Sequence, residues 1–153
     1  MALVKTVATN RKAFHNYNIG ETVEAGIALT GTEIKSIRSG MVNLSDSFVR
    51  PENGELWLWN AHIARYDAGS YMSHEPMRSR KLLLHRKEIR ELSGKVAEKG
   101  LTLIPVRLYL KDNLAKVAIA LAKGKKLHDK RETIIRRETE REISRAMKNR
   151  REN

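Results

Sequence analysis

Hydrophobic and polar residues alternate along much of the first 122 residues, which is the pattern of half-buried β-strands. In the run 55–59, two leucines fall on one face and two tryptophans on the other, so we predict a strand that is covered on both sides. The Asn53-Gly54 pair before it favours a tight hairpin turn, with 48–50 as the partner strand.

A second hairpin is predicted further along the chain. The apolar, β-rich runs 101–110 and 115–122 are joined by 111–114, whose Asp and Asn suit a turn. Pro105 lies inside the first run and lacks an N–H for the sheet, so we expect an edge or a bulge at that point.

Two short helices interrupt the predicted strands. Thr32–Ser39 lies between two glycines and has isoleucines three residues apart, and His85–Lys99 repeats apolar residues at helical spacing before Gly100. Together these elements predict a mainly β fold with small helices (α+β). We expect a closed antiparallel β-barrel of the oligonucleotide-binding type with flanking helices, although a sandwich would give similar patterns.

Charge divides the chain into two parts. The protein carries 30 Lys+Arg against 18 Asp+Glu, a net charge of +12, and residues 123–153 hold 12 of the cations and 6 of the acids. We therefore predict a folded domain over residues 1–122 and a basic tail over residues 123–153. The imbalance points to a polyanionic partner, with nucleic acid ahead of an anionic membrane surface.

The location and the chemistry are bounded by what the sequence lacks. No apolar run approaches the ~18 residues of a spanning helix and no signal segment is evident, so we expect a cytoplasmic protein. The absence of cysteine excludes disulfides, Cys-ligated zinc and thiol nucleophiles. The five histidines show no metal-binding spacing, and we expect neither a cofactor nor catalysis.

The tail has a narrow apolar stripe of one residue in every four from Ile135 to Met147, which is too thin to anchor a helix by itself. Favourable and repulsive charge pairs at the i,i+4 spacing nearly cancel along it. We therefore predict a segment that is disordered alone and becomes helical against a polyanionic surface.

Three constellations could bind RNA, and each has a structural alternative. Arg78-Ser79-Arg80-Lys81, before a leucine run, is either a row of phosphate contacts or a solvated loop. The segment Asn10-Arg11-Lys12, with rings at His15 and Tyr17, could contact unpaired bases, but a frayed N-terminus is the favoured interpretation from composition alone. Glu24 could accept hydrogen bonds from base amino groups or, more commonly, pair with a nearby arginine.

Several segments together resemble one family, small protein B, which binds transfer-messenger RNA in trans-translation. The similarity runs in order from about Asn10 to Lys148 and includes the junction into the tail. The matching stretches are 24–29 with Gly31, 33–38, 43–47, 80–84, 122–126 and 128–131.

The resemblance implies an oligonucleotide-binding-like barrel that holds the transfer-like domain of transfer-messenger RNA. It also implies a tail that enters the empty messenger channel of a stalled ribosome and folds there as a helix. By position it assigns the RNA-binding face to Asn10, Glu24, Lys35, Arg38 and Lys81, with Lys123 and Lys125 near it, and we add Arg11, Lys12 and Arg80. The ribosomal decoding region would be met by Gly124, Lys126, His128, Asp129, Lys130, Arg131, Met147 and Lys148.

One departure from the family pattern is Ala146 before Met147, where family tails often carry isoleucine. The partners implied are transfer-messenger RNA, the stalled ribosome and, indirectly through the charged RNA, elongation factor Tu. No membrane partner is expected, and the protein is expected to be a monomer. From the residues alone, a structural ribosomal protein remains an alternative, and a small nuclease is disfavoured because no paired-carboxylate or histidine cluster is present.

Overall fold

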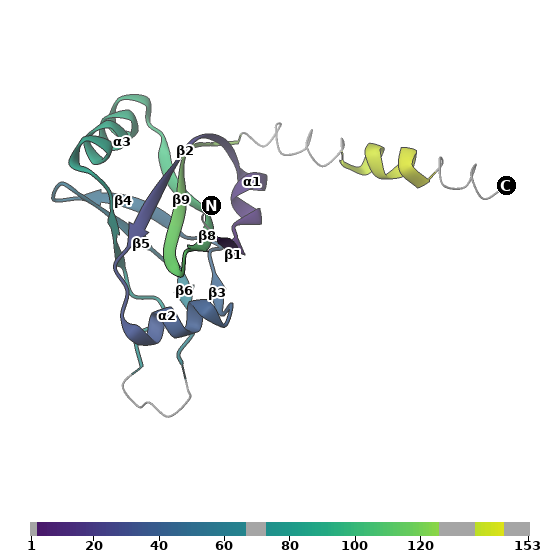
Figure 1. Ribbon diagram of the computed structural model, residues 1–153. Coiled ribbons are helices and arrows are strands. Elements are labelled where there is room, and N and C mark those ends of the chain that lie inside the picture. The colour runs from purple at the N-terminus through teal and green to yellow at the C-terminus, as the bar shows by residue number, and fades with distance from the viewer. Residues whose placement is uncertain (1–2, 67–72, 126–136, 146–153) are drawn as a thin grey trace. The chain divides into compact units, whose positions relative to one another are not determined.

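The structure is a computed structural model that describes residues 3–66, 73–125 and 137–145 (Figure 1). The chain divides into two compact units, Met1–Lys123 and Gly124–Asn153.

Unit 1 contains a seven-stranded sheet in the order β1-β8-β4-β5-β7-β2-β9, with an additional pairing between β8 and β9. The hydrogen-bonded pairs therefore form a ring through β8, β4, β5, β7, β2 and β9, and β1 is added to β8. The pairings β1–β8, β2–β7, β4–β5, β4–β8, β5–β7 and β8–β9 are antiparallel, which confirms a mainly β α+β fold. The sheet strands are β1 (Val4–Thr9), β2 (Tyr17–Ile27), β4 (Phe48–Glu52), β5 (Glu55–Trp59), β7 (Arg80–Leu83), β8 (Thr102–Lys111) and β9 (Leu114–Gly124); β3 (Val42–Asn43) and β6 (His62–Ile63) pair separately.

Three helices surround this sheet in the described part of unit 1, namely α1 (Arg11–Asn16), α2 (Gly31–Arg38) and α3 (Arg86–Lys99). Figure 1 shows α2 beside β3 and β6 at one end of the unit and α3 at the opposite end. Among the described residues, no helix has the length and apolar character needed to cross a membrane.

Both predicted hairpins are confirmed, and their turn residues explain why. β4 and β5 pair across Asn53 and Gly54, which have φ values of 50° and 76°. β8 and β9 pair across Asp112 and Asn113, with φ values of 51° and 66°. Positive φ at both central residues belongs to the turn whose twist matches antiparallel strands, and Asn, Asp and Gly tolerate it best. The β8–β9 register also shifts between Pro105 and Arg107, so of the two predicted alternatives, an edge or a bulge, the structure has the bulge.

The two predicted helices are confirmed with small changes at their starts. α2 begins one residue earlier than expected because Thr30 and Glu33 form a capping box around its first turn. α3 ends at Gly100, whose φ of 61° is the left-handed conformation of a helix C-terminus.

The structure contradicts the favoured interpretation of the N-terminal segment as a frayed end. Residues 4–9 form β1 on β8, and Asn10 caps α1 by accepting a hydrogen bond from the Ala13 N–H at 3.2 Å. Its amide also donates to the Pro105 carbonyl at 2.9 Å. The segment is therefore held in the sheet and is not frayed. The hydrogen bond to Pro105 spans 95 residues of sequence, so no local pattern could have revealed it.

The core lies inside the ring of strands. Leu56 and Leu58 of β5 are fully buried while the alternating Trp57 and Trp59 are partly buried, as the period-two pattern predicts. α3 contributes Leu92, which is 4% exposed, to the same core. This placement leaves the outer faces of β2, β5, β7 and α3 to carry the functional side chains.

Unit 2 is described over residues 124–125 and 137–145, and residues 137–145 are helical with every side chain exposed. Of the predicted stripe, Thr139 and Ile143 fall in this helix, while Ile135 and Met147 lie outside the described residues. The prediction that this segment is disordered alone stays a prediction.

Candidate nucleic-acid interface

Glu24 lies on the outer face of β2, where it accepts hydrogen bonds from the Tyr109 hydroxyl and, at 3.5 Å, from the Lys111 ammonium. The Tyr109 hydrogen bond, which outweighs the effect of burial, and the nearby charges of Lys111 and Lys116 hold the pKa of Glu24 below its ordinary value. The partners are a tyrosine and lysines, and not the arginine that the sequence suggested. Because Glu24 is still 39% exposed, an ionised carboxylate with spare acceptor capacity faces solvent.

The neighbouring strand places an apolar side chain beside this carboxylate. Leu83 of β7 pairs with Gly26 of β2 and is 52% exposed. A β-carbon on Gly26 would come within 3.2 Å of the Leu83 Cβ, so the glycine allows the leucine to lie close to the strand. A shallow hollow of about 400 Å³ lies here, and Gly26, Leu84, His85 and Glu88 also line it. We name three of its side chains, Glu24, Leu83 and Lys116, the Glu24 surface.

Tyr109 supports this surface from β8. Burial and the hydrogen bond to Glu24 raise the pKa of the Tyr109 phenol to about 12. The Arg107 guanidinium lies 4.6 Å from the centre of its ring, in a cation–π contact. The phenol therefore remains protonated and donates to Glu24 throughout the neutral range.

Lys81 is the next outward residue along β7, two positions from Leu83. Its ammonium lies 2.9 Å from the Glu55 carboxylate of β5, and its side chain is 42% exposed. An exposed pair of this kind is weak, so Lys81 can exchange its carboxylate partner for a phosphate at little cost.

The structure contradicts the prediction that Arg80 contacts phosphate. Its side chain points into the molecule, is 0% exposed, and forms an ion pair with the fully buried Glu33 of α2. Its guanidinium also donates to the Ala61 carbonyl at 2.7 Å and the Pro76 carbonyl at 3.0 Å. Arg80 thus fastens α2 to β7 and offers no donor to a ligand at the surface.

Arg78 joins the same network, which explains the ionisation of Glu33. Burial by itself would raise the pKa of Glu33. Hydrogen bonds from Arg78, the Thr30 N–H and Arg80 outweigh it, and the pKa of this carboxyl lies below its ordinary value. Burial disfavours the charged form of Arg80 as well, and it lowers the pKa of this guanidinium although the Glu33 carboxylate acts in the opposite direction. We name Glu33, Arg78 and Arg80 the internal ion network.

The remaining predicted cations lie on other elements. On α2, Arg38 is exposed, and the Lys35 ammonium lies 5.5 Å from the centre of the Tyr66 ring. On α1, Arg11 is exposed and Lys12 pairs with Asp46 at 2.6 Å.

The structure also contradicts the prediction that Asn10 contacts RNA. Its side chain is only 2% exposed, and its amide is engaged by Ala13 and Pro105 as described above. In this arrangement it positions α1 and the cations on it, and does not reach a ligand.

The predicted tail residues are only partly described. Lys123 ends unit 1, and Gly124 and Lys125 begin unit 2. The other predicted contacts with the decoding region lie outside the described residues, namely Lys126, His128, Asp129, Lys130, Arg131, Met147 and Lys148.

Sequence reasoning missed Leu83, Lys116 and Tyr109 as members of this interface. Lys116 had a signal, because it is a lone cation within an apolar strand and must therefore face outward. Leu83 sits in a run of three leucines, in which nothing local tells which one is exposed. Among the described residues no group of His, Asp or Glu side chains is arranged to hold a metal ion.

Comparison with known proteins adds an independent observation. Residues 7–149 match the family model of the SmpB protein. An SsrA-binding protein of Dehalococcoides mccartyi is 63% identical over 148 residues, covering 97% of this chain and 86% of the relative. An SsrA-binding protein of Carboxydothermus hydrogenoformans is 59% identical over 144 residues, covering 94% and 97% of the two chains.

The fold of this chain is also similar to that of a chain in a solved structure. It is described as "tmRNA-SmpB: a journey to the center of the bacterial ribosome", and its matching chain is 55% identical with a TM-score of 0.67. The match covers 78% of this chain and 85% of that chain.

Proposed function

This chain belongs to the SmpB family, the tmRNA-binding proteins of trans-translation, and on that premise we propose that it holds the RNA through the Glu24 surface. SmpB proteins bind RNA and are not enzymes, which decides against the nuclease alternative. The family assignment also decides against a structural ribosomal protein.

The observation that carries the proposal is the combination of three chemistries on adjoining strands. The ionised Glu24 can accept hydrogen bonds from the amino and imino groups of bases. Leu83 offers an exposed apolar side chain against which a base or ribose can pack, and Lys116 offers a cation for a phosphate. A carboxylate repels phosphate, so the contribution of Glu24 in a protein of charge +12 lies in selecting a base edge and not in attracting the backbone.

We propose that the transfer-like domain of tmRNA is the part that is bound, on a closed, oligonucleotide-binding-like barrel. The ring of hydrogen-bonded strands supports a barrel of this type. Lys81, Lys35, Arg38, Arg11 and Lys12 then supply phosphate contacts around the Glu24 surface or on other faces of the same RNA.

Residues 123–153 are proposed to act separately, as the part that reads the ribosome. The resemblance connects the tail with the decoding region and the empty messenger channel. The residues concerned are Gly124, Lys126, His128, Asp129, Lys130, Arg131, Met147 and Lys148. The helical, fully exposed residues 137–145 support a segment that needs an external surface to pack against. The proposal includes action as a monomer in the cytoplasm, with elongation factor Tu meeting it only through the charged RNA.

A binding titration tests the Glu24 surface together with Lys81, which lies two positions from Leu83 on β7. Glu24→Ala and Lys81→Ala in the full chain should weaken binding to the transfer-like domain of tmRNA in a gel-shift titration. Loss of a hydrogen bond to a charged group costs about 1.5–3 kcal/mol, which is roughly tenfold or more in affinity for Glu24→Ala. Circular dichroism should stay as in the parent, and Glu75→Ala, at an exposed carboxylate away from the surface, is the matched control. Unchanged affinity in both variants would contradict the assignment.

A truncation tests the division of labour. Deleting residues 129–153 should leave the affinity for tmRNA nearly unchanged and abolish tagging of stalled peptides in a reconstituted translation reaction. Loss of both activities together would overturn the separation into an RNA-holding unit and a ribosome-reading tail.

A further inference from the structure

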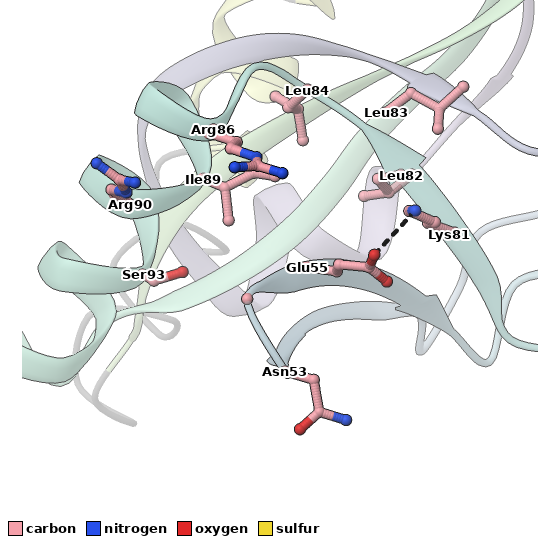
Figure 2. A pocket seen from close by; sticks show the side chains of 11 residues that line it. Asn53, Glu55, Lys81, Leu82, Leu83, Leu84, Arg86, Ile89, Arg90 and Ser93 are labelled. Atoms are coloured by element: carbon pink, nitrogen blue, oxygen red, sulfur yellow. Dashed lines mark ion pairs between the residues drawn. The ribbon is translucent and has the colours of Figure 1, made fainter.

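A second hollow, larger than the one at the Glu24 surface, lies between α3 and the strands β5 and β7. Its volume is about 660 Å³, within the range of about 300–1,000 Å³ that is usual for sites of small molecules. Figure 2 shows three side chains of α3, those of Arg86, Ile89 and Ser93, on the side of the helix toward Glu55 and Lys81. We name this cavity the α3 hollow.

The charges of the α3 hollow favour an anion. Arg86 and Arg90 are both exposed, lie one helical turn apart, and have no acidic partner in the ion pairs of the described residues. Like charges at this spacing repel, so an anion bound near this turn of α3 relieves an unfavourable interaction. Glu55 and Lys81 both line the hollow and their charges cancel, so Arg86 and Arg90 leave the lining with a net positive charge.

The rest of the lining combines an apolar wall with two neutral polar side chains, those of Asn53 and Ser93. Leu82 is 1% exposed, Leu84 and Ile89 are partly buried, and the three form the apolar part of the wall. Ser93 supplies a hydroxyl that can donate or accept a hydrogen bond. Cations, an apolar wall and a few neutral polar groups are the chemistry that recognises a phosphate joined to a flat heterocycle.

We propose that the α3 hollow binds one unstacked nucleotide of tmRNA, with its phosphate at Arg86 and Arg90 and its base against Leu84 and Ile89. The inference rests on the proposed function and extends it to a second binding site. Continuity supports tmRNA as the source, because Leu83 and Leu84 line both this hollow and the one at the Glu24 surface. The two hollows are therefore adjacent, and an RNA bound at the Glu24 surface has the α3 hollow directly beside it.

The experiment compares two pairs of charge-removing substitutions on the same helix. R86Q/R90Q removes the two cations of the hollow, and K87Q/K99Q removes two exposed cations of α3 that do not line it. The full-length variants are titrated with the transfer-like domain of tmRNA at several salt concentrations.

We expect R86Q/R90Q to lower affinity roughly tenfold at low salt. The slope of log K against log salt should become shallower by about 0.7 to 0.9 for each phosphate that the variant no longer neutralises. K87Q/K99Q should stay within about twofold of the parent. Equal effects of the two pairs would show only general electrostatic attraction and would overturn the proposal.

A second variant tests the pocket without changing charge. Ser93→Phe fills the α3 hollow from its helix side, and it should weaken tmRNA binding severalfold while circular dichroism stays unchanged. In parallel, the photoreactive residue p-benzoylphenylalanine at position 93 should cross-link to a single short stretch of tmRNA. Cross-linking to ribosomal RNA instead, or binding of free AMP with no change in tmRNA affinity, would assign the hollow to another ligand and overturn the proposal.

The Glu24→Ala titration separates the two levels of inference. If Glu24→Ala weakens tmRNA binding and the α3 variants do not, the α3 hollow fails and the proposed function stands. If the α3 variants weaken binding and Glu24→Ala does not, the Glu24 surface fails and the RNA is held mainly at α3.

Discussion

Two carboxylates of unit 1, Glu33 and Glu24, show how one interaction type serves two purposes. Glu33 is fully buried and is held by Arg78 and Arg80 in the internal ion network. Glu24 is 39% exposed and is held by Tyr109 and Lys111 at the surface. Both have a pKa below the ordinary value, so both are ionised at neutral pH.

The difference lies in what remains available after these partners are satisfied. The Glu33 carboxylate accepts hydrogen bonds from Arg78 and Arg80, and Arg80 also donates to backbone carbonyls. Solvent does not reach this carboxylate. At Glu24, solvent reaches the carboxylate, and Leu83 beside it is half exposed. A charge is therefore structural where burial makes its loss costly and is available for recognition where exposure keeps its partners weak.

The largest expected effect comes from breaking the internal ion network. Glu33→Gln leaves Arg80 buried without a full counter-charge, and removing one partner of a buried pair costs about 3–5 kcal/mol. The free energy of unfolding, measured by urea denaturation, should fall by that amount. Glu75→Gln is the control, because Glu75 pairs with Arg65 at 3.8 Å with both side chains more than half exposed, and it should change stability by about 1 kcal/mol or less. Equal effects of the two variants would contradict the contrast.

Acid should act on the same network. The pKa of Glu33 is lower in the folded chain than the ordinary 4.5, so the unfolded chain binds the proton more readily. The contribution of Glu33 is then fully present above about pH 4.5 and is lost as the pH falls through the folded pKa. Unfolding free energies measured from about pH 6 to about pH 3 should therefore decline more steeply in the parent than in Glu33→Gln. Parallel curves would mean that Glu33 does not control the acid limb.

A smaller effect is expected at the exposed surface, and on binding instead of stability. Leu83→Ala removes about half of a leucine's packing against RNA, worth about 1–1.5 kcal/mol on the area scale, or roughly tenfold in affinity. Because Leu83 is 52% exposed, the urea midpoint should change little. Leu82→Ala next to it, at 1% exposure, should do the reverse and lower stability by about 2–5 kcal/mol. A common outcome for the two neighbouring leucines would contradict the assignment of faces.

The smallest expected effect concerns the hydrogen bond from Tyr109 to Glu24. This bond is the largest single cause of the lowered pKa of Glu24, so Tyr109→Phe should raise that pKa toward its ordinary value. Binding of tmRNA should then be lost at a higher pH on acidification than in the parent, while affinity at neutral pH changes only slightly. Carboxyl NMR titration of Glu24 measures the shift directly. An unchanged titration would show that Lys111 and Lys116 alone hold the carboxylate ionised.

Local chemistry determined much of the fold from the sequence alone. Both hairpins, the Pro105 bulge and α3 with Gly100 depend on residues within a few positions of one another. Turn residues that accept positive φ, and a proline without an N–H, act through their own backbone, so their effect can be read without knowing the rest of the molecule. The basic charge and the resemblance to the family likewise came from the residues alone.

Only the tertiary structure decided which charged residues are buried and which stay exposed. In the run 80–84, alternation places Arg80, Leu82 and Leu84 on one face, but three successive leucines hide which face is buried. The partner that neutralises Arg80 is Glu33, 47 residues earlier in the chain, and Asn10 is likewise bound by Pro105 from a distant strand. Burial and pairing across such distances arise only when strands meet, because a side chain's environment is set by its neighbours in space and not by its neighbours in sequence.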